Sequence, residues 1–99
     1  MKVLITGSNG QLGYALINSS PKSIGDNNIE IIKGTRENMN LLNQEKCEKF
    51  LENFKPNWII NCGAYTAVDK AESDCINAFK INTKGPYFLA KKCLSLIHI

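Results

Sequence analysis

Short hydrophobic runs recur along the first 60 residues, each ending near a glycine or an asparagine. Residues 3–5 (VLI) and 58–60 (WII) are uninterrupted apolar runs, and residues 29–33 (IEIIK) form a third apolar-rich segment. Short continuous runs of this kind are typical of parallel strands that are buried on both faces. The pattern therefore predicts three strands, with the first and the third buried.

An amphipathic segment separates the first two strands. In residues 11–19, Leu12, Ala15 and Leu16 share one face at the spacing i, i+3, i+4. This spacing is that of one face of an α-helix, and it predicts the first helix.

A second amphipathic segment, residues 42–55, separates the second strand from the third. Asn43 is the expected N-cap and Pro56 the expected stop. Its apolar side chains repeat at i, i+3, i+4 and i+7 and predict a stripe that packs in the core. The stripe consists of Cys47, Phe50, Leu51 and Phe54.

The order strand, helix, strand, helix, strand with short joints indicates a right-handed parallel α/β sheet. We therefore expect an α/β fold, a Rossmann-like parallel sheet with helices on both faces. A complete fold of this kind with a substrate site usually needs more than about 150 residues. The chain has 99 residues, so we expect only the N-terminal part of such a domain.

The remaining segments are a turn and two helices. Residues 23–28 (SIGDNN) read as a polar turn. Residues 74–82 are expected to be helical, and their apolar face would hold Cys75, Ala78, Phe79 and Asn82. A further helix is expected over residues 84–93. Gly85-Pro86 is unfavourable inside a helix and predicts a break, with Pro86 in the first turn of a new helix.

Three glycines follow the first strand at the spacing GxxGxxG. Gly7 would allow a tight turn, Gly10 a close approach of the main chain to a pyrophosphate, and Gly13 close packing of the helix on the strand. Free N–H groups at the start of the helix would complete an anion site. A plain strand-turn-helix without a ligand is the alternative, since turns and helix ends also use glycine.

The end of the second strand bears on the choice of cofactor. An acidic residue there accepts hydrogen bonds from the ribose hydroxyls of NAD, whereas an arginine accommodates the 2′-phosphate of NADP. Glu30 lies inside the strand and Glu37 follows Arg36, so no acidic residue occupies the fitting place. Arg36, helped by Thr35, therefore favours NADP(H), with NAD(H) as the other option. A loop arginine that binds nothing is the alternative for Arg36.

Composition excludes several classes of protein. Apolar residues make up 43% and charged residues 21% of the chain, the net charge is +3, and the lysines are scattered. We therefore expect neither a membrane span, nor a secretory signal, nor a nucleic-acid-binding surface. The four cysteines show no CxxC spacing and no nearby histidine, which argues against a metal site and indicates reduced, mostly buried thiols in the cytoplasm. They are Cys47, Cys62, Cys75 and Cys93.

Three blocks of sequence resemble the dTDP-4-dehydrorhamnose reductase family, which belongs to the extended short-chain dehydrogenases/reductases. They are MKVLITGSNGQLG, PNWIINCGAYTAVDKAES and FKINTKGPYFLAKKC. The stretch from Asn61 to Glu72 matches the most specific motif of the family. The resemblance covers residues 1–93, the N-terminal third of such an enzyme and part of its NAD(P)-binding domain.

The resemblance implies a set of cofactor-binding residues. Gly10, Gln11 and Leu12 would meet the pyrophosphate, on a turn shaped by Gly7 and Gly13. The other implied contacts are Asn40 and Leu41 beside the adenine, and Ala64, Tyr65 and Thr66 along the middle of the cofactor. Asp69, Lys70 and Glu72 would lie at the mouth of the site, although such a charged run by itself reads as a solvated turn.

The reaction implied is the NAD(P)H-dependent reduction of the 4-keto group of dTDP-4-dehydro-L-rhamnose. In the family, a YxxxK tyrosine delivers the proton and a Ser or Thr polarises the carbonyl. Only Tyr87 and Lys91 have that spacing here, and they fall in a helix that precedes the expected place. We therefore expect no catalytic residue in this chain, and no such role for His98.

The resemblance implies a dTDP-sugar substrate and is compatible with a homodimer. Three alternatives remain. A related nucleotide-sugar epimerase or reductase and a non-catalytic regulatory subunit of the methionine adenosyltransferase beta type both share this N-terminal region. The third is an isolated fragment with no function.

Residues 94–99 (LSLIHI) match the translation of a transposon adapter used in sequencing libraries. We therefore expect the native sequence to end near Cys93. The alternative is that LIHI begins a fourth strand, although the preceding helix would then enter it almost without a loop.

Overall fold

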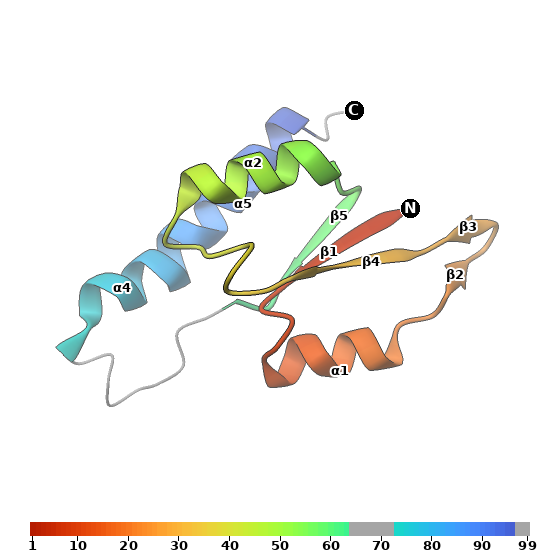
Figure 1. Cartoon of the computed structure of the whole chain (residues 1–99), viewed down its shortest axis with the longest axis horizontal. Helices are drawn as coiled ribbons and strands as arrows, with labels where there is room; N and C mark the ends of the chain where they lie inside the picture. The colour runs from red at the N-terminus through yellow and green to blue at the C-terminus, as the bar shows by residue number, and fades with distance from the viewer. Residues whose placement is uncertain (64–72, 97–99) are drawn as a thin grey trace.

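The computed structural model describes residues 1–63 and 73–96, with side chains as far as residue 93. Strands and helices alternate from residue 2 to residue 61, apart from a small hairpin that precedes the second long strand, and the residues from 75 onward are helical (Figure 1). The elements are β1 (Lys2–Thr6), α1 (Gln11–Ser19), β2 (Ser23–Ile24), β3 (Asn27–Asn28), β4 (Glu30–Gly34), α2 (Gln44–Phe54), β5 (Trp58–Asn61), α4 (Cys75–Phe79), the π-helix η1 (Lys80–Lys84) and α5 (Gly85–Leu96).

β1 lies at the centre of a parallel three-stranded sheet with the order β4-β1-β5. Figure 1 shows α1 on one face of this sheet and α2 with α5 on the other. All three strands point the same way, so their carboxyl ends meet at one edge. This arrangement confirms the predicted α/β fold with a Rossmann-like parallel sheet.

The main core lies between the sheet and the pair α2 and α5. Leu4 of β1 is fully buried, and alternation along the strand turns Val3 and Ile5 to the opposite face. An ion pair of 2.8 Å between Lys92 Nζ and Glu48 Oε1 also joins α5 to α2. The buried members of the core are Leu4, Ile32, Met39, Leu41, Cys47, Leu51, Phe88 and Leu89.

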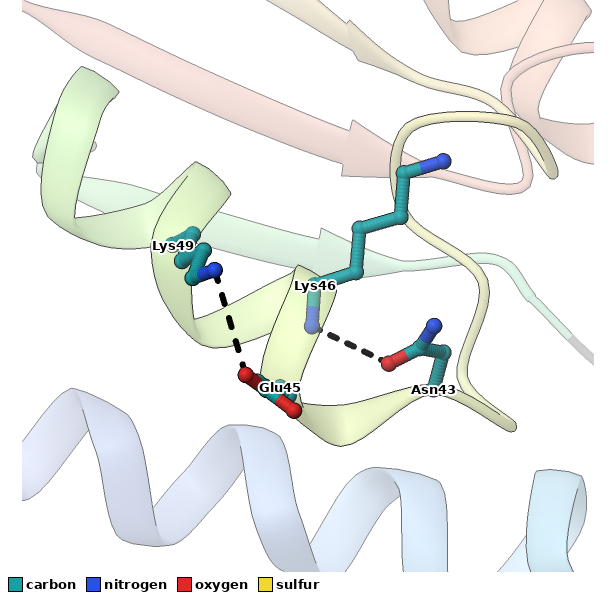
Figure 2. Close-up of polar contacts among 4 residues, drawn as sticks. All are labelled: Asn43, Glu45, Lys46 and Lys49. Carbon is teal, nitrogen blue, oxygen red and sulfur yellow. Dashed lines mark hydrogen bonds and ion pairs between the residues drawn. The ribbon is translucent and has the colours of Figure 1, made fainter.

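The start of α2 follows the prediction from the sequence. Asn43 Oδ1 accepts a hydrogen bond of 3.1 Å from the main-chain N–H of Lys46, as Figure 2 shows. This bond supplies a partner for one of the N–H groups that a helix leaves unpaired in its first turn. On the outer surface, Glu45 and Lys49 approach to 3.8 Å at the spacing i, i+4.

Two predictions of burial are wrong. Trp58 and Ile60 of β5 are 64% and 42% exposed, because β5 is an edge strand of the described sheet. Phe54 is 42% exposed and stacks on Phe50 with a centroid distance of 4.6 Å, at the end of α2 where the helix leaves the core. In α1 only Gly13 is buried, so the predicted apolar face with Leu12 packs against little in this part of the chain.

Residues 23–28 are a small hairpin rather than a simple turn. β2 and β3 pair antiparallel around Gly25 and Asp26, and Gly25 has a φ of +59°. A glycine with positive φ in the first loop position is typical of two-residue hairpin loops. The mostly polar sequence of residues 23–28 gives no strand pattern, because each strand of the hairpin is only two residues long.

The helical region from residue 75 onward is divided where the sequence predicts a break. α4 ends at Phe79, η1 follows, and Pro86 lies in the first turn of α5. In an α-helix the ring of Pro86 would collide with the carbonyl of Asn82. The wider π turn avoids this, with the N–H of Gly85 bonded to the carbonyl of Lys80. The single helix expected over residues 74–82 is therefore split, and α4 has no buried residue.

The cysteines are less buried than predicted. All four are free thiols, but only Cys47 is buried, while Cys62 and Cys93 are half-buried and Cys75 is exposed. Burial raises the pKa of the Cys62 and Cys93 thiols. Burial also raises the pKa of Cys47, against a smaller opposite effect of the Lys46 charge.

Candidate nucleotide-binding site

The turn between β1 and α1, residues 7–13, is called the glycine loop below. Gly7 has a φ of +61°, a conformation that favours glycine. A Cβ at Gly7 would lie 2.6 Å from the carbonyl oxygen of Cys62 and 2.8 Å from the nitrogen of Gly63. Gly7 thus lets the glycine loop lie directly against the end of β5.

The other two glycines of the loop fix the start of α1. A Cβ at Gly13 would overlap the carbonyl oxygen of Gly7 and lie 2.8 Å from the Cα of Ser8. Gly10 is exposed and is the N-cap of α1, where no side chain caps the helix. The first turn of α1 therefore presents N–H groups and the positive end of the helix dipole at the carboxyl edge of the sheet.

Thr6 connects the glycine loop to the end of β5. Its side chain is buried, and its Oγ1 donates a hydrogen bond of 2.5 Å to Asn61 Oδ1. The same Oγ1 accepts hydrogen bonds from the N–H groups of Cys62 at 3.1 Å and Gly63 at 3.3 Å. Two loops that the sequence places more than 50 residues apart are thereby held at one hydroxyl.

The exit from β4 is a turn closed by Asn38. Asn38 Oδ1 accepts from the N–H of Thr35 at 2.6 Å, and Asn38 Nδ2 donates to the carbonyl of Lys33 at 3.1 Å. The hydroxyl of Thr35 also bonds to the Asn38 side chain, at 3.2 Å. Arg36 lies exposed at the tip of this turn and has no ion pair with an acidic residue of the described ranges 1–63 and 73–96.

Asn40 and Leu41 lie on the segment that leads to α2. Asn40 Oδ1 accepts from the N–H of Leu42 at 3.0 Å, so this oxygen is used within the chain. Leu41 is buried, and its Cδ1 lies 3.1 Å from the Cβ positions that Gly63 and Gly85 lack. Leu41 is therefore a core residue at the carboxyl edge.

Ser8 is the second residue of the glycine loop. Its side chain is 3% exposed, and its Oγ has no hydrogen-bond partner within residues 1–63 and 73–96. Its main-chain N–H donates to the carbonyl of Gly34 at 3.1 Å. Ser8 thus joins the glycine loop to the end of β4, as Thr6 joins it to the end of β5.

The described residues bring most of the predicted site to one edge of the sheet. The loops after β1 and β5 meet at Thr6, and the loops after β1 and β4 meet at Ser8. The predicted contacts Ala64, Tyr65 and Thr66 lie outside the described residues, as do Asp69, Lys70 and Glu72.

The structure adds residues that the sequence interpretation did not single out. They are Thr6, Ser8 and Asn38. The signal for Thr6 was its position as the last residue of β1, opposite Asn61 in the parallel register. That register is a property of two strands together, and neither strand alone reveals it.

Within the part of the chain that the structure describes, no helix is long and apolar enough to cross a membrane. The same residues contain no group of three or more His, Cys, Asp or Glu side chains placed to hold a metal ion.

Comparison with known proteins agrees with this architecture. A crystal structure of a dTDP-4-dehydrorhamnose reductase from Clostridium acetobutylicum matches with a TM-score of 0.85 and 40% identity, over 98% of this chain and 33% of that one. The enzyme of the same name from Bacillus anthracis, solved in complex with NADP, matches with a TM-score of 0.82 and 29% identity, over 96% of this chain and 33% of that one.

Relatives in sequence bear the same name. The dTDP-4-dehydrorhamnose reductase of Aggregatibacter actinomycetemcomitans is 33% identical over 99% of this chain and 34% of its own length. The chain thus spans about a third of the relatives that it matches. The family model described as the RmlD substrate binding domain matches residues 1–99. The chain therefore belongs to the dTDP-4-dehydrorhamnose reductase family, over the region of this RmlD domain model.

Proposed function

We propose that this chain is the N-terminal, NADPH-binding part of a dTDP-4-dehydrorhamnose reductase, which reduces dTDP-4-dehydro-L-rhamnose to dTDP-L-rhamnose. The observation that carries the proposal is the glycine loop, held at Thr6 and Ser8 against the ends of both neighbouring strands. The carboxyl ends of such strands are where open parallel α/β sheets bind ligands. The named relatives, one of them solved with NADP, support the choice of reaction and cofactor.

The residues at the edge fit a dinucleotide. The N-terminus of α1 has no capping side chain, and Gly10 leaves it open to a pyrophosphate. The buried hydroxyl of Ser8 has no hydrogen-bond partner among the residues that the structure describes. In this proposal Gly10, Gln11 and Leu12 hold the pyrophosphate, on the turn shaped by Gly7 and Gly13.

The second part of the fit concerns the adenosine and the centre of the cofactor. Asn40 and Leu41 would lie beside the adenine, with the Nδ2 of Asn40 as a donor, since its Oδ1 is used by Leu42. Arg36, on the turn that contains Thr35, would pair with the 2′-phosphate. Ala64, Tyr65 and Thr66 are proposed to line the middle of the cofactor.

NADPH supplies the hydride when it is bound, and the proton donor lies outside this chain. Tyr87 and Lys91 do not form a catalytic pair in our proposal. Tyr87 is 68% exposed on α5, and Lys91 Nζ lies over its ring at 6.0 Å from the centroid. In this proposal the described residues bind and orient NADPH. Proton transfer and sugar recognition are the tasks of the remaining two-thirds of the enzyme.

We further propose a cytoplasmic enzyme that acts on a dTDP-sugar and binds neither nucleic acid nor membranes. A homodimer is compatible with the family. The scattered lysines and the net charge of +3 support the absence of a nucleic-acid surface.

The test follows NADPH oxidation at 340 nm by the protein that carries residues 1–99, with dTDP-4-dehydro-L-rhamnose as substrate. We expect turnover with NADPH and a higher kcat/KM than with NADH. Arg36→Gln should reduce kcat/KM for NADPH by about tenfold or more and leave that for NADH nearly unchanged, since an arginine–phosphate pair is a strong charge-assisted contact.

Lys22→Gln is the matched control, because Lys22 is exposed near the amino end of β4, away from the glycine loop. Lys22→Gln should change neither the kcat/KM for NADPH nor that for NADH. If dTDP-4-dehydro-L-rhamnose is not reduced while a different nucleotide sugar is reduced or epimerised, the related epimerase or reductase is the correct assignment. If NADPH binds without any turnover, the non-catalytic regulatory subunit is correct.

A further inference from the structure

Asn9 and Gly10 are the only Asn-Gly pair in the sequence, and they lie in the glycine loop. Both residues are exposed. In the described part of the chain the side-chain amide of Asn9 has no hydrogen-bond partner. The amides of Asn38, Asn40 and Asn43, by contrast, are held by bonds to the main chain. The side chain of Asn9 can therefore turn toward the main-chain nitrogen that follows it.

Gly10 leaves that nitrogen accessible, because it has no Cβ to hinder an approach. Its N–H donates to the carbonyl of Gly7 at 3.0 Å, so the opening of one turn releases the nitrogen. Asn18 is the useful comparison, since it is also exposed. The residue after it, Ser19, carries a Cβ and lies inside α1, where the helix holds the main-chain N–H.

We infer that Asn9 is a site of spontaneous deamidation, which places a carboxylate in the glycine loop. The main-chain nitrogen of Gly10 attacks Cγ of Asn9 and forms a C–N bond. The Cγ–Nδ2 bond breaks, and ammonia leaves with the proton of the Gly10 nitrogen. Water then opens the cyclic succinimide at either of its carbonyls and gives aspartate or isoaspartate. The reaction consumes water and releases ammonia, and nothing is oxidised or reduced.

Either product puts a negative charge directly before the start of α1, where the pyrophosphate is proposed to bind. The charge repels an anionic ligand. Isoaspartate also adds a methylene to the main chain and displaces Gly10. In the cofactor-free protein the same charge is favourable, because it lies at the positive end of the helix dipole. The modified chain should therefore stay folded and bind dinucleotides less tightly. The modification is independent of the proposed function, whereas the loss of binding rests on it.

The first experiment incubates the protein that carries residues 1–99 without cofactor at mildly alkaline pH, where the attacking nitrogen loses its proton more readily. Trypsin cleavage after Lys2 and Lys22 then gives one peptide that contains both Asn9 and Asn18. Tandem mass spectrometry compares the two side chains in this peptide, and a sample digested without incubation corrects for conversion during the digest. We expect Asn9 to be converted and Asn18 to keep its amide.

Asn9→Gln is the control for the chemistry, because the longer side chain closes a ring much more slowly. The glutamine should keep its amide through the same incubation. An Asn9 that stays intact, or that converts no faster than Asn18, would overturn the inference.

The second experiment measures dissociation constants for NADPH and NADH by titration calorimetry. Asn9→Asp should weaken both about tenfold, since the two cofactors share the pyrophosphate. Its urea midpoint should be unchanged or raised, which separates lost binding from lost folding. Asn18→Asp adds the same charge in the last turn of α1 and should leave both dissociation constants unchanged.

The remaining outcomes are decisive as well. If Asn9→Asp binds NADPH as tightly as the unsubstituted protein, the effect on the anion site is overturned even where Asn9 is converted. If the unsubstituted protein binds neither cofactor, the proposed function fails, and the peptide still shows whether Asn9 is a deamidation site.

Discussion

Thr6 and Asn61 face each other at the carboxyl ends of β1 and β5, and their side chains are joined by a hydrogen bond of 2.5 Å. The Thr6 hydroxyl donates this bond and accepts two others, from the N–H groups of Cys62 and Gly63. One buried hydroxyl thus determines how the chain leaves β5. The segment that leaves there is the one expected to line the middle of the cofactor.

Replacement of Thr6 by valine tests this relationship, because valine keeps the shape and removes the hydroxyl. We expect a loss of about 1–3 kcal/mol in the free energy of unfolding, since the buried Thr6 hydroxyl makes three part-buried hydrogen bonds that valine cannot make. Urea unfolding measures it. Thr83→Val is the control, because Thr83 is exposed in η1, and it should change the stability by less than about 0.5 kcal/mol. Equal stabilities of the two variants would contradict the role of Thr6.

Gly7 and Gly25 provide a matched pair. Both have positive φ, +61° and +59°, but a Cβ at Gly7 would collide with the main chain of Cys62, whereas nothing lies within 4 Å of a Cβ at Gly25. Gly25→Ala should cost about 1 kcal/mol for the left-handed conformation alone. Gly7→Ala should cost about 2–4 kcal/mol, since overlap is added to strain. If chemical denaturation gives similar losses of unfolding free energy for the two variants, the end of β5 can move to accommodate a Cβ at Gly7, and the prediction is wrong.

The cap of α2 makes a smaller contribution that can be measured separately. Asn43→Ala removes the bond to the N–H of Lys46 and should reduce stability by about 1 kcal/mol. Lys49→Ala removes the contact between Lys49 and Glu45. Their side chains are 73% and 84% exposed, so the free energy of unfolding should change by less than about 0.5 kcal/mol. If Lys49→Ala is the more damaging variant in thermal unfolding, the ranking is wrong.

Alkaline pH should destabilise the fold through the buried thiol of Cys47. Burial raises the pKa of Cys47 in the folded chain, so the folded state keeps a proton that the unfolded state releases. Stability is then complete below the ordinary thiol pKa of about 8.5 and decreases as the pH rises above it. Cys47→Ala should reduce the slope of unfolding free energy against pH between about pH 8 and 10, measured under reducing conditions. Cys75→Ala, at an exposed thiol, should leave the slope unchanged.

The periodic elements could be predicted because their signals are local. β1, α1 and the capped start of α2 follow from apolar spacing and from one asparagine, and their ends agree with the expected ones to within two residues. The break at Pro86 was also predictable, since the ring clash depends on a single residue. Positive φ at Gly7 belongs to the same class of local signals.

Exposure was less predictable, because it depends on what lies beside an element. The run WII reads as a buried strand, yet Trp58 and Ile60 are exposed on an edge strand in a chain that spans a third of its relatives. The roles of Thr6 and Ser8 were hidden for a related reason. Each depends on a contact with a strand more than 20 residues away, and the sequence does not show strand register.

The π turn at Lys80–Lys84 sets the rotational phase of α5. Each residue of an α-helix turns the chain by about 100°, so one additional residue in a turn rotates all that follows by that angle. Phe88 and Leu89 are buried beyond the turn, whereas no residue of α4 is buried before it. Deletion of one residue within η1 would convert the π turn into regular α-helix. It would also rotate α5 by about 100° and turn Phe88 and Leu89 away from the sheet. The wide turn therefore determines the rotation of α5 about its own axis and is not needed for α5 to be helical.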